Sequence, residues 1–209
     1  MTARNGDTTP LTLAVPKGRL QDRTVDLLRS RGYEIRFEDR KLMAEDPAGR
    51  LQVMLVKNSD LPTYVHHGIA GLGVCGTDVI YENGYRFFTL MDMPFGRTRM
   101  CLASRAGYQP AGETRRLRVA SKFTRFTRDY FQDRGIPCEI IRLDGSVELA
   151  PVLGLTPYIV DLVETGDTLR ANDLTVVEEL ATVSVVLMAN PAYYKFHYKS
   201  IDALVDTLR

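Results

Sequence analysis

Residues 158–172 read Tyr-Ile-Val-Asp-Leu-Val-Glu-Thr-Gly-Asp-Thr-Leu-Arg-Ala-Asn, a mostly apolar run that ends in a turn rich in threonine and glycine. The apolar part, residues 158–163, is typical of a buried strand. Gly166 permits a turn with positive φ, after which backbone amides can point at an anion. Thr165 and Thr168 add hydroxyl donors beside those amides. The segment is therefore a candidate binding loop for the phosphate of a sugar.

Two acids accompany this loop. Asp161 and Glu164 can accept hydrogen bonds from ribose hydroxyls or face a bound cation. The alternative is an ordinary strand–turn–helix junction in which Asp167 or Thr168 is the N-cap of the helix. The segment alone does not separate the two interpretations, so the rest of the chain decides between them.

Composition limits the classes of partner. The chain has 209 residues, with 27 basic and 26 acidic side chains and a formal net charge of +1. No global field draws it to nucleic acid or to an anionic membrane, so any bound anion needs a local cluster of cations. The three cysteines, Cys75, Cys101 and Cys138, are widely spaced and form no C-x-x-C pair, which indicates reduced thiols in or near the core.

The N-terminal residues 1–10 are polar and lack the apolar core of a signal peptide. No stretch reaches the ~18 apolar residues of a membrane span. We therefore expect a cytoplasmic protein.

Strand and helix patterns alternate along the chain, which predicts α/β layers with largely parallel strands. A break at Met93-Pro94-Phe95-Gly96 suggests a domain crossover. We expect domain I to contain residues 1–93 and 184–209, and domain II to contain residues 94–183. The expected strands are 11–15, 40–44, 51–56, 71–74, 86–91, 99–104, 117–120, 138–142, 158–163, 174–180 and 183–189. The expected helices are 21–31, 61–67, a short one from 76, 123–134, 147–153 and 201–208.

A basic loop follows the first expected strand. Lys17 and Arg19 flank Gly18, at the end of a strand where open α/β sheets bind ligands. Both cations suit a phosphate, and glycine lets the backbone approach it. Arg40 lies beside another expected strand and can reach an anion or only shield a sheet edge. A solvated basic loop remains the alternative for Lys17 and Arg19.

Glu148 follows the turn Asp144-Gly145-Ser146, in which Ser146 is a candidate N-cap. Glu148 can accept hydrogen bonds from sugar hydroxyls or only complement a helix dipole. The histidines show no metal-ligand spacing, and no nucleophile–base–acid constellation is present. The chemistry that remains is positioning and charge stabilisation, which suits a substrate with a good leaving group such as pyrophosphate.

Five blocks taken in order resemble the ATP phosphoribosyltransferase family of histidine biosynthesis. They are residues 13–20, 60–65, 73–78, 145–151 and the opening segment, and together they cover nearly the whole chain. The resemblance implies a two-domain α/β fold like that of periplasmic binding proteins, with the active site in the interdomain cleft. It also implies the reaction, in which N1 of ATP attacks C1 of phosphoribosyl pyrophosphate and pyrophosphate departs with the help of Mg²⁺.

The resemblance assigns roles by position. Thr165, Gly166, Asp167 and Thr168 are implied to hold the 5-phosphate, and Glu148, Asp161 and Glu164 to face the ribose or magnesium. Lys17, Gly18, Arg19 and Arg40 are implied to meet pyrophosphate and the ATP phosphates, with Arg19 and Arg40 as the catalytic cations. The Mg²⁺ arrives with phosphoribosyl pyrophosphate, so no dedicated protein ligands are expected.

The chain departs from the family at Gly71, where an acid is frequent, and at Asp173, where glycine is usual. Asp tolerates positive φ better than most residues. The chain ends soon after its catalytic part, so it resembles the short form, which lacks a C-terminal regulatory domain. This form implies a homodimer that assembles with a regulatory subunit related to histidyl-tRNA synthetase into a hetero-octamer.

Two rival functions are open. A solute-binding protein of the same fold would bind a small anion, but the lack of a signal peptide weighs against it. A nucleobase phosphoribosyltransferase also places acids before its sugar-phosphate loop, but those acids usually stand adjacent, whereas Asp161 and Glu164 are three residues apart.

Overall fold

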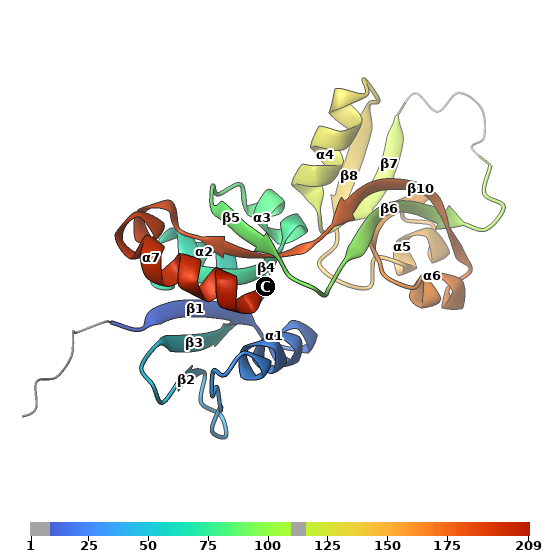
Figure 1. Cartoon of the computed structure of the whole chain (residues 1–209). Coiled ribbons are helices and arrows are strands. Elements are labelled where there is room, and N and C mark those ends of the chain that lie inside the picture. Colours follow the sequence, from blue (N-terminus) through green and yellow to red (C-terminus); the bar gives the residue numbers. More distant parts are fainter. Residues whose placement is uncertain (1–8, 110–115) are drawn as a thin grey trace, which may run out of the picture. The chain divides into compact units, whose positions relative to one another are not determined.

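A computed structural model describes residues 9–109 and 116–209; residues 1–8 of the polar N-terminal segment lie outside this description. The chain divides into two compact units, each with its own sheet (Figure 1). Unit 1 holds the chain up to Gly96 and again from Val185 onward, and unit 2 holds the part between Arg97 and Ser184. The sequence predicted that the chain passes between the two domains at residues 93/94 and 183/184. In the structure, the chain passes between the units at residues 96/97 and 184/185.

Unit 1 contains a six-stranded sheet in the order β2-β3-β1-β4-β11-β5. β1 pairs in parallel with both β3 and β4, so the C-terminal ends of these three strands share one edge. The strands are β1 (Leu11–Pro16), β2 (Met43–Glu45), β3 (Leu51–Val56), β4 (Leu72–Gly76), β5 (Phe88–Asp92) and β11 (Val185–Ala189). The helices are α1 (Arg19–Ser30), α2 (Leu61–His66), α3 (Thr77–Asn83) and α7 (Pro191–Leu208).

Helices cover both faces of this sheet, because successive side chains of its strands point to opposite faces. Leu13 of β1 enters a core shared with Leu28 of α1 and Leu204 of α7, whereas the next residue, Ala14, packs with Leu61 of α2. Both faces are therefore apolar, which is why the strands read as nearly continuous hydrophobic runs.

Unit 2 contains a five-stranded sheet in the order β10-β6-β9-β7-β8. Its strands are β6 (Thr98–Arg105), β7 (Leu117–Ser121), β8 (Cys138–Arg142), β9 (Tyr158–Val163) and β10 (Leu174–Val183). Val160 of β9 packs with Phe131 of α4 (Thr124–Asp133). Ile159 enters a second core with Ala150 of α5 (Leu149–Val152) and Leu169 of α6 (Asp167–Ala171).

The expectation of largely parallel strands is wrong, because both sheets are mixed. β6 runs antiparallel to β9 and β10, and β11 runs antiparallel to β4 and β5. β2 also runs antiparallel to β3. β2 joins β3 through residues 46–50 alone, and a parallel neighbour would need a crossover of a dozen or more residues. β5 passes to β6 and β10 passes to β11 without an intervening helix, but each of these connections joins strands of different sheets.

The last helix begins ten residues earlier than residues 201–208 predicted, at Pro191. Asn190 is its N-cap, and the Asn190 side-chain oxygen accepts hydrogen bonds from the Ala192 and Tyr193 backbone N–H groups at 2.9 and 3.1 Å. Pro191 fits the first helical position, where no N–H is needed. His197 has non-helical dihedral angles (φ −120°, ψ 16°) and kinks the helix before its apolar stripe begins.

The two departures from the family have physical reasons in this fold. A Cβ on buried Gly71 would lie 2.0 Å from Cε1 of Tyr193, so no side chain fits there while the tyrosine ring is in place. Asp173 adopts φ 56°, the conformation that a glycine would otherwise supply.

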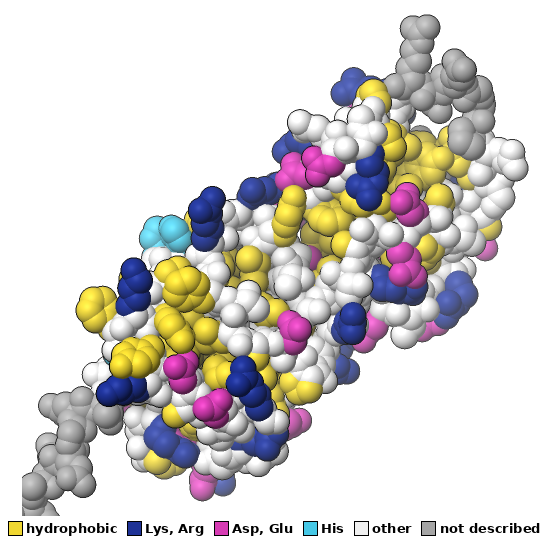
Figure 2. All heavy atoms as spheres, turned by 45° about the horizontal axis from the view of Figure 1, so that its top comes forward, with side chains coloured by type: hydrophobic (Ala, Val, Ile, Leu, Met, Phe, Trp, Pro, Cys, Tyr) yellow, Lys and Arg dark blue, Asp and Glu magenta, His cyan; other side chains and the backbone are white. Residues whose placement is uncertain are grey.

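Within residues 9–109 and 116–209, no helix has both the length and the apolar character needed to cross a membrane. Basic and acidic side chains are interspersed over the face drawn in Figure 2, with no continuous field of one sign. All three cysteines are free thiols, as predicted; Cys75 and Cys101 are buried and Cys138 is half-buried.

Candidate functional site

The candidate residues of unit 2 gather at one edge of its sheet. β7 runs parallel to both β8 and β9, so the C-terminal ends of these strands lie together. Asp161 stands near the end of β9, and Lys122 follows directly after the end of β7. This edge is where open α/β sheets bind ligands.

Asp161 is a largely buried carboxylate with a cation beside it. Its side chain is 20% exposed, and its Oδ1 lies 3.7 Å from the Lys122 ammonium and accepts the Leu162 N–H at 2.9 Å. Burial raises the pKa of Asp161, and Glu148 raises it further, whereas Lys122 and the Leu162 N–H lower it. The effect of burial is the largest, so the pKa of Asp161 lies above its ordinary value.

The turn after β9 has the conformation that the sequence predicts. Gly166 adopts φ 81°, in the left-handed region that favours glycine. Gly166 is also the N-cap residue of α6, so the expectation that Asp167 or Thr168 caps this helix is wrong. A side chain at the Gly166 position would need positive φ, whereas an N-cap with a capping side chain normally has β-region dihedral angles.

Asp167 is neutralised within the loop. Its carboxylate accepts a hydrogen bond from the Thr165 hydroxyl at 2.6 Å and is paired with the guanidinium of Arg170. These two partners hold the pKa of Asp167 below its ordinary value. Arg170 also donates to the Thr165 carbonyl at 3.1 Å, so it braces the loop at two points.

Glu148 and Glu164 complete the acids of this edge. Glu148 is the N-cap residue of the short helix α5 and is close enough to Asp161 to raise the pKa of that carboxyl. The expectation that Ser146 caps this helix is wrong, because Ser146 adopts φ 47° two residues earlier and is part of the preceding turn. Glu164 is exposed, directly beyond the end of β9.

In unit 1, the basic loop leaves the C-terminal end of β1. Lys17 and Arg19 are exposed, and the Lys17 N–H donates to the Val56 carbonyl of β3 at 3.0 Å. Gly18 adopts φ 99° and ψ −151° and is the N-cap residue of α1. Only glycine populates this region readily, so Gly18 allows the chain to turn from strand into helix.

Arg40 lies outside the strand that was expected to begin with it, because β2 starts only at Met43. It adopts φ 59° in a turn, and its 92% exposed side chain lies 3.7 Å from the Asp39 carboxylate. The antiparallel pairing of Met43 with Met54 carries this turn to the edge of the sheet where β3 ends. Lys17 follows β1 at the same edge, since Pro16 pairs with Val56.

Sequence reasoning missed three cations at these edges: Lys57 after β3, Lys122 after β7 and Arg170 on α6. A usable signal existed for the first two. Lys57 follows the expected strand 51–56 directly, and Lys122 stands two residues after the expected strand 117–120, as Lys17 does after 11–15. Arg170 had no such signal, because its role depends on contacts three and five residues back in the loop.

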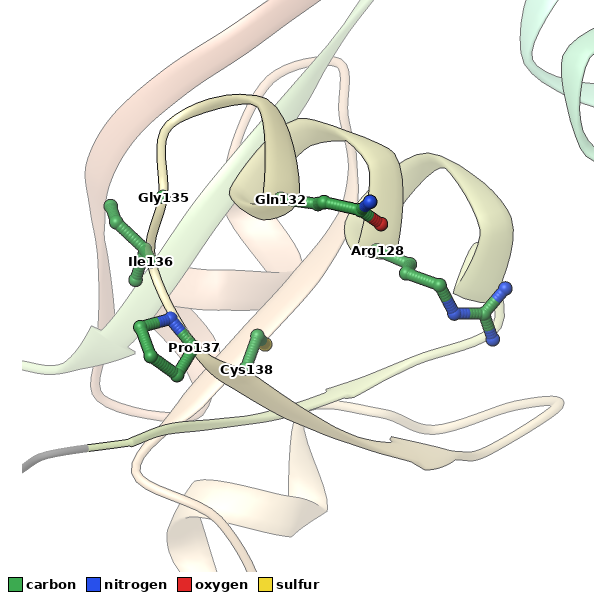
Figure 3. A pocket seen from close by; sticks show the side chains of 6 residues that line it. All are labelled: Arg128, Gln132, Gly135, Ile136, Pro137 and Cys138. Carbon is green, nitrogen blue, oxygen red and sulfur yellow. The ribbon is translucent and has the colours of Figure 1, made fainter.

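Unit 2 also has a cavity away from the edge that holds Asp161. It measures about 360 Å³ and is lined by Arg128, Gln132, Gly135, Ile136, Pro137 and Cys138 (Figure 3). Figure 3 shows the arginine and glutamine projecting from α4 and the proline and cysteine at the start of β8. This is the opposite end of β8 from the edge with Asp161, and no candidate residue lines the cavity.

The fold is that of an α/β protein of the periplasmic-binding-protein type, with candidate binding residues at the C-terminal ends of parallel strands in each sheet. Solved structures share this fold: the sulphonate-binding protein SsuA from Escherichia coli is 12% identical, with a TM-score of 0.65 over 97% of this chain and 72% of its own. The ATP phosphoribosyl transferase (HisG:HisZ) complex from Thermotoga maritima is similar at 34% identity and TM-score 0.84, over 95% of this chain and 96% of that one.

Sequence comparisons identify the family. A family model described as "HisG: ATP phosphoribosyltransferase" matches residues 57–209. The ATP phosphoribosyltransferase of Streptococcus gordonii is 44% identical over 88% of this chain and 87% of its own, and that of Brachyspira hyodysenteriae is 40% identical over 95% and 98%. The chain belongs to the ATP phosphoribosyltransferase family, pentosyltransferases of the first step of histidine biosynthesis.

Proposed function

We propose that this chain transfers the phosphoribosyl group of phosphoribosyl pyrophosphate to N1 of ATP, and that the edge of the unit 2 sheet binds the phosphoribosyl group. The observation that carries the proposal is the order of parts along β9 and the loop after it: the largely buried Asp161 in the strand, then the turn at Gly166 with φ 81°. Family membership supplies the reaction, and this geometry suits its sugar-phosphate substrate.

The 5-phosphate binds the loop from Thr165 to Thr168 through backbone N–H groups and the Thr168 hydroxyl, and the Thr165 hydroxyl joins them by turning away from the Asp167 carboxylate. Asp167 contributes its N–H rather than its carboxylate, because a free carboxylate would repel a phosphate. The pairing of that carboxylate with Arg170 removes this repulsion. Asp161, Glu148 and Glu164 serve the ribose hydroxyls or the magnesium ion.

The cations of unit 1 meet the leaving group and the ATP phosphates. Lys17, Arg19 and Arg40 stabilise the negative charge that develops on pyrophosphate, and arginine stays protonated throughout. Gly18 lets the backbone approach the phosphates, since it has no side chain.

The chemistry needs no general base. The lone pair on N1 of adenine forms the new bond to C1 of the ribose, and the bond from C1 to the pyrophosphate oxygen breaks with its electron pair leaving on pyrophosphate. No proton has to be removed from N1 for this step. The protein therefore acts by orientation and by preplaced charge.

Magnesium fits the donor set as an ion carried by the substrate. Among the described residues, no group of three or more His, Cys, Asp or Glu side chains could hold a metal ion. Mg²⁺ commonly binds through one or two carboxylates together with substrate phosphates, and Glu148 or Glu164 can supply such a ligand. When bound, it neutralises charge on pyrophosphate.

We also propose that the chain works with a regulatory subunit. Its similarity to the Thermotoga maritima HisG:HisZ complex supports a partner of that kind. We further propose that this chain forms a homodimer, and that such dimers assemble with the partner into a hetero-octamer, as the resemblance to the two-subunit members of the family implies.

The test is to incubate the purified chain with ATP, phosphoribosyl pyrophosphate and Mg²⁺ and to measure phosphoribosyl-ATP by mass spectrometry. Parallel reactions replace ATP with free purine and pyrimidine bases, and each is repeated with the regulatory subunit. We expect product with ATP only. No product with ATP under either condition, or product with a free base instead, would overturn the proposal.

A further inference from the structure

Hydrogen bonds at the end of β7, one of them to the neighbouring strand β9, hold Lys122 beside Asp161. Ser121, at the end of β7, is fully buried, and its hydroxyl donates to the Val160 carbonyl of β9 at 2.6 Å. The same hydroxyl oxygen accepts the Phe123 N–H at 2.9 Å. These two bonds fix the turn after β7 against β9, and Lys122 lies between them.

The Lys122 side chain is itself oriented. Its ammonium stands 4.7 Å from the centroid of the Phe123 ring and 3.7 Å from Oδ1 of Asp161. The Phe123 side chain is 4% exposed, so the ring beneath the lysine is fixed by the core. A cation–π contact and an ion pair together favour one position of the ammonium over the many open to a free lysine.

We propose that Lys122 is a positioning residue for phosphoribosyl transfer, holding the Asp161 carboxylate in place as the acceptor for ribose hydroxyls and leaving magnesium to another acid. This inference rests on the proposed function and deepens it. Two cations at one carboxylate repel each other, so the ammonium at 3.7 Å disfavours Mg²⁺ at Asp161.

The other groups that face Asp161 do not replace Lys122. Glu148, on α5, carries a like charge, which favours the protonated form of Asp161. Cys101 of β6 is the register partner of Asp161, and burial raises the pKa of its thiol, so it stays neutral. Without Lys122, burial and Glu148 both favour the protonated form of Asp161, and only the hydrogen bond from the Leu162 N–H still favours the ionised form.

The test compares Lys122→Met with Lys122→Arg, which keeps the charge, and with Arg118→Met. Arg118 is a matched control: it lies on β7, is 46% exposed where Lys122 is 42% exposed, and pairs with Glu139 at 3.5 Å instead of Asp161. Calorimetry measures binding of phosphoribosyl pyrophosphate with Mg²⁺ to the full chain between pH 5 and 9, without ATP. Lys122→Gln, with a polar tip, serves in place of the Met variant if the latter does not fold.

We expect Lys122→Met to bind about tenfold more weakly at pH 7, with the loss of binding on the acid side moved to higher pH, because a nearby opposite charge lowers the pKa of a carboxyl group. Lys122→Arg and Arg118→Met should bind within threefold of the wild type and keep its pH profile. Lys122→Met should need no more Mg²⁺ than the wild type, because the variant lacks the cation that opposes Mg²⁺ at Asp161.

Three results would overturn the inference: unchanged affinity and pH profile in Lys122→Met, an equal loss in Arg118→Met, or a higher Mg²⁺ requirement in Lys122→Met. The last would show that the ammonium does not oppose Mg²⁺ at Asp161. The proposed function fails separately, if the wild-type chain forms no phosphoribosyl-ATP. If the wild type forms product but Lys122→Met binds phosphoribosyl pyrophosphate with wild-type affinity and pH profile, only the role of Lys122 is refuted.

Discussion

Replacing Gly166 with alanine tests the phosphate loop through its backbone. Gly166 adopts φ 81°, and an added Cβ would lie 3.2 Å from Nη1 of Arg170 and 3.8 Å from Cγ1 of Val163. A left-handed conformation costs an L-residue roughly 1–2 kcal/mol. The contact with Arg170 adds to this cost by displacing the guanidinium that donates to the Thr165 carbonyl at 3.1 Å.

The strain predicts two effects of Gly166→Ala. Urea unfolding should show a loss of about 1–2 kcal/mol in the free energy of unfolding. Displacing Arg170 unbraces the loop and removes the cation paired with the Asp167 carboxylate, so the Kd for phosphoribosyl pyrophosphate should rise roughly 5–30-fold. Calorimetry of the full chain with Mg²⁺ measures that Kd.

Gly154→Ala is the matched control. Gly154 also lies in unit 2 and adopts φ 75°, but an added Cβ there meets nothing within 4 Å. It should lose similar stability and keep the wild-type Kd. The reasoning is refuted if Gly166→Ala binds phosphoribosyl pyrophosphate within twofold of the wild type, or if both variants lose affinity equally.

Three further predictions follow from other parts of the chain. Arg19→Ala should lower kcat at least tenfold while urea unfolding changes by less than about 0.5 kcal/mol, because Arg19 is exposed; a wild-type rate would remove it from the mechanism. Asp46→Asn should destabilise the fold by about 1.5–3 kcal/mol at pH 7, because the buried carboxylate accepts two bonds from Arg50, at 2.7 and 3.1 Å. Arg50 lowers the folded-state pKa of Asp46. The stabilisation from this pair is therefore present above the unfolded pKa of about 4 and is lost as pH falls through the folded-state pKa. If the free energies of unfolding of wild type and variant still differ by the same amount at pH 2, the ionised Asp46 is not the source of the stabilisation. Gly71→Ala should cost about 1–3 kcal/mol by displacing Tyr193, and thermal unfolding indistinguishable from wild type would show that the ring moves freely.

Much of the fold could be predicted because its strands are apolar on both faces. The bounds of β3, β8 and β9 coincide with the expected 51–56, 138–142 and 158–163. Strand direction could not be read in this way, since it depends on which strands pair, and pairing is a long-range property. The first half of α7 was missed because residues 191–200 carry aromatic and polar side chains without an apolar stripe; Asn190-Pro191 was the signal for its start.

In the candidate site, too, local properties could be predicted from the sequence, whereas contacts between distant residues could not. Gly166 and Asp173 were predicted to allow positive φ, and they do, because that preference is local to the residue. Lys122 was missed because its partner, Asp161, is distant in sequence and becomes its neighbour only when β7 pairs with β9. Arg40 was identified for its charge, but the hairpin that carries it to the edge beside Lys17 required the structure.

Amide hydrogen exchange tests the central claim that the loop after β9 binds the phosphoribosyl group. The full chain is exchanged with and without phosphoribosyl pyrophosphate and Mg²⁺, and the peptide that spans residues 161–170 is followed by mass spectrometry. We predict slower exchange in this peptide, because the N–H groups from Gly166 to Thr168 become bonded to the 5-phosphate. Bound substrate that protects other peptides and leaves residues 161–170 unchanged would contradict the account.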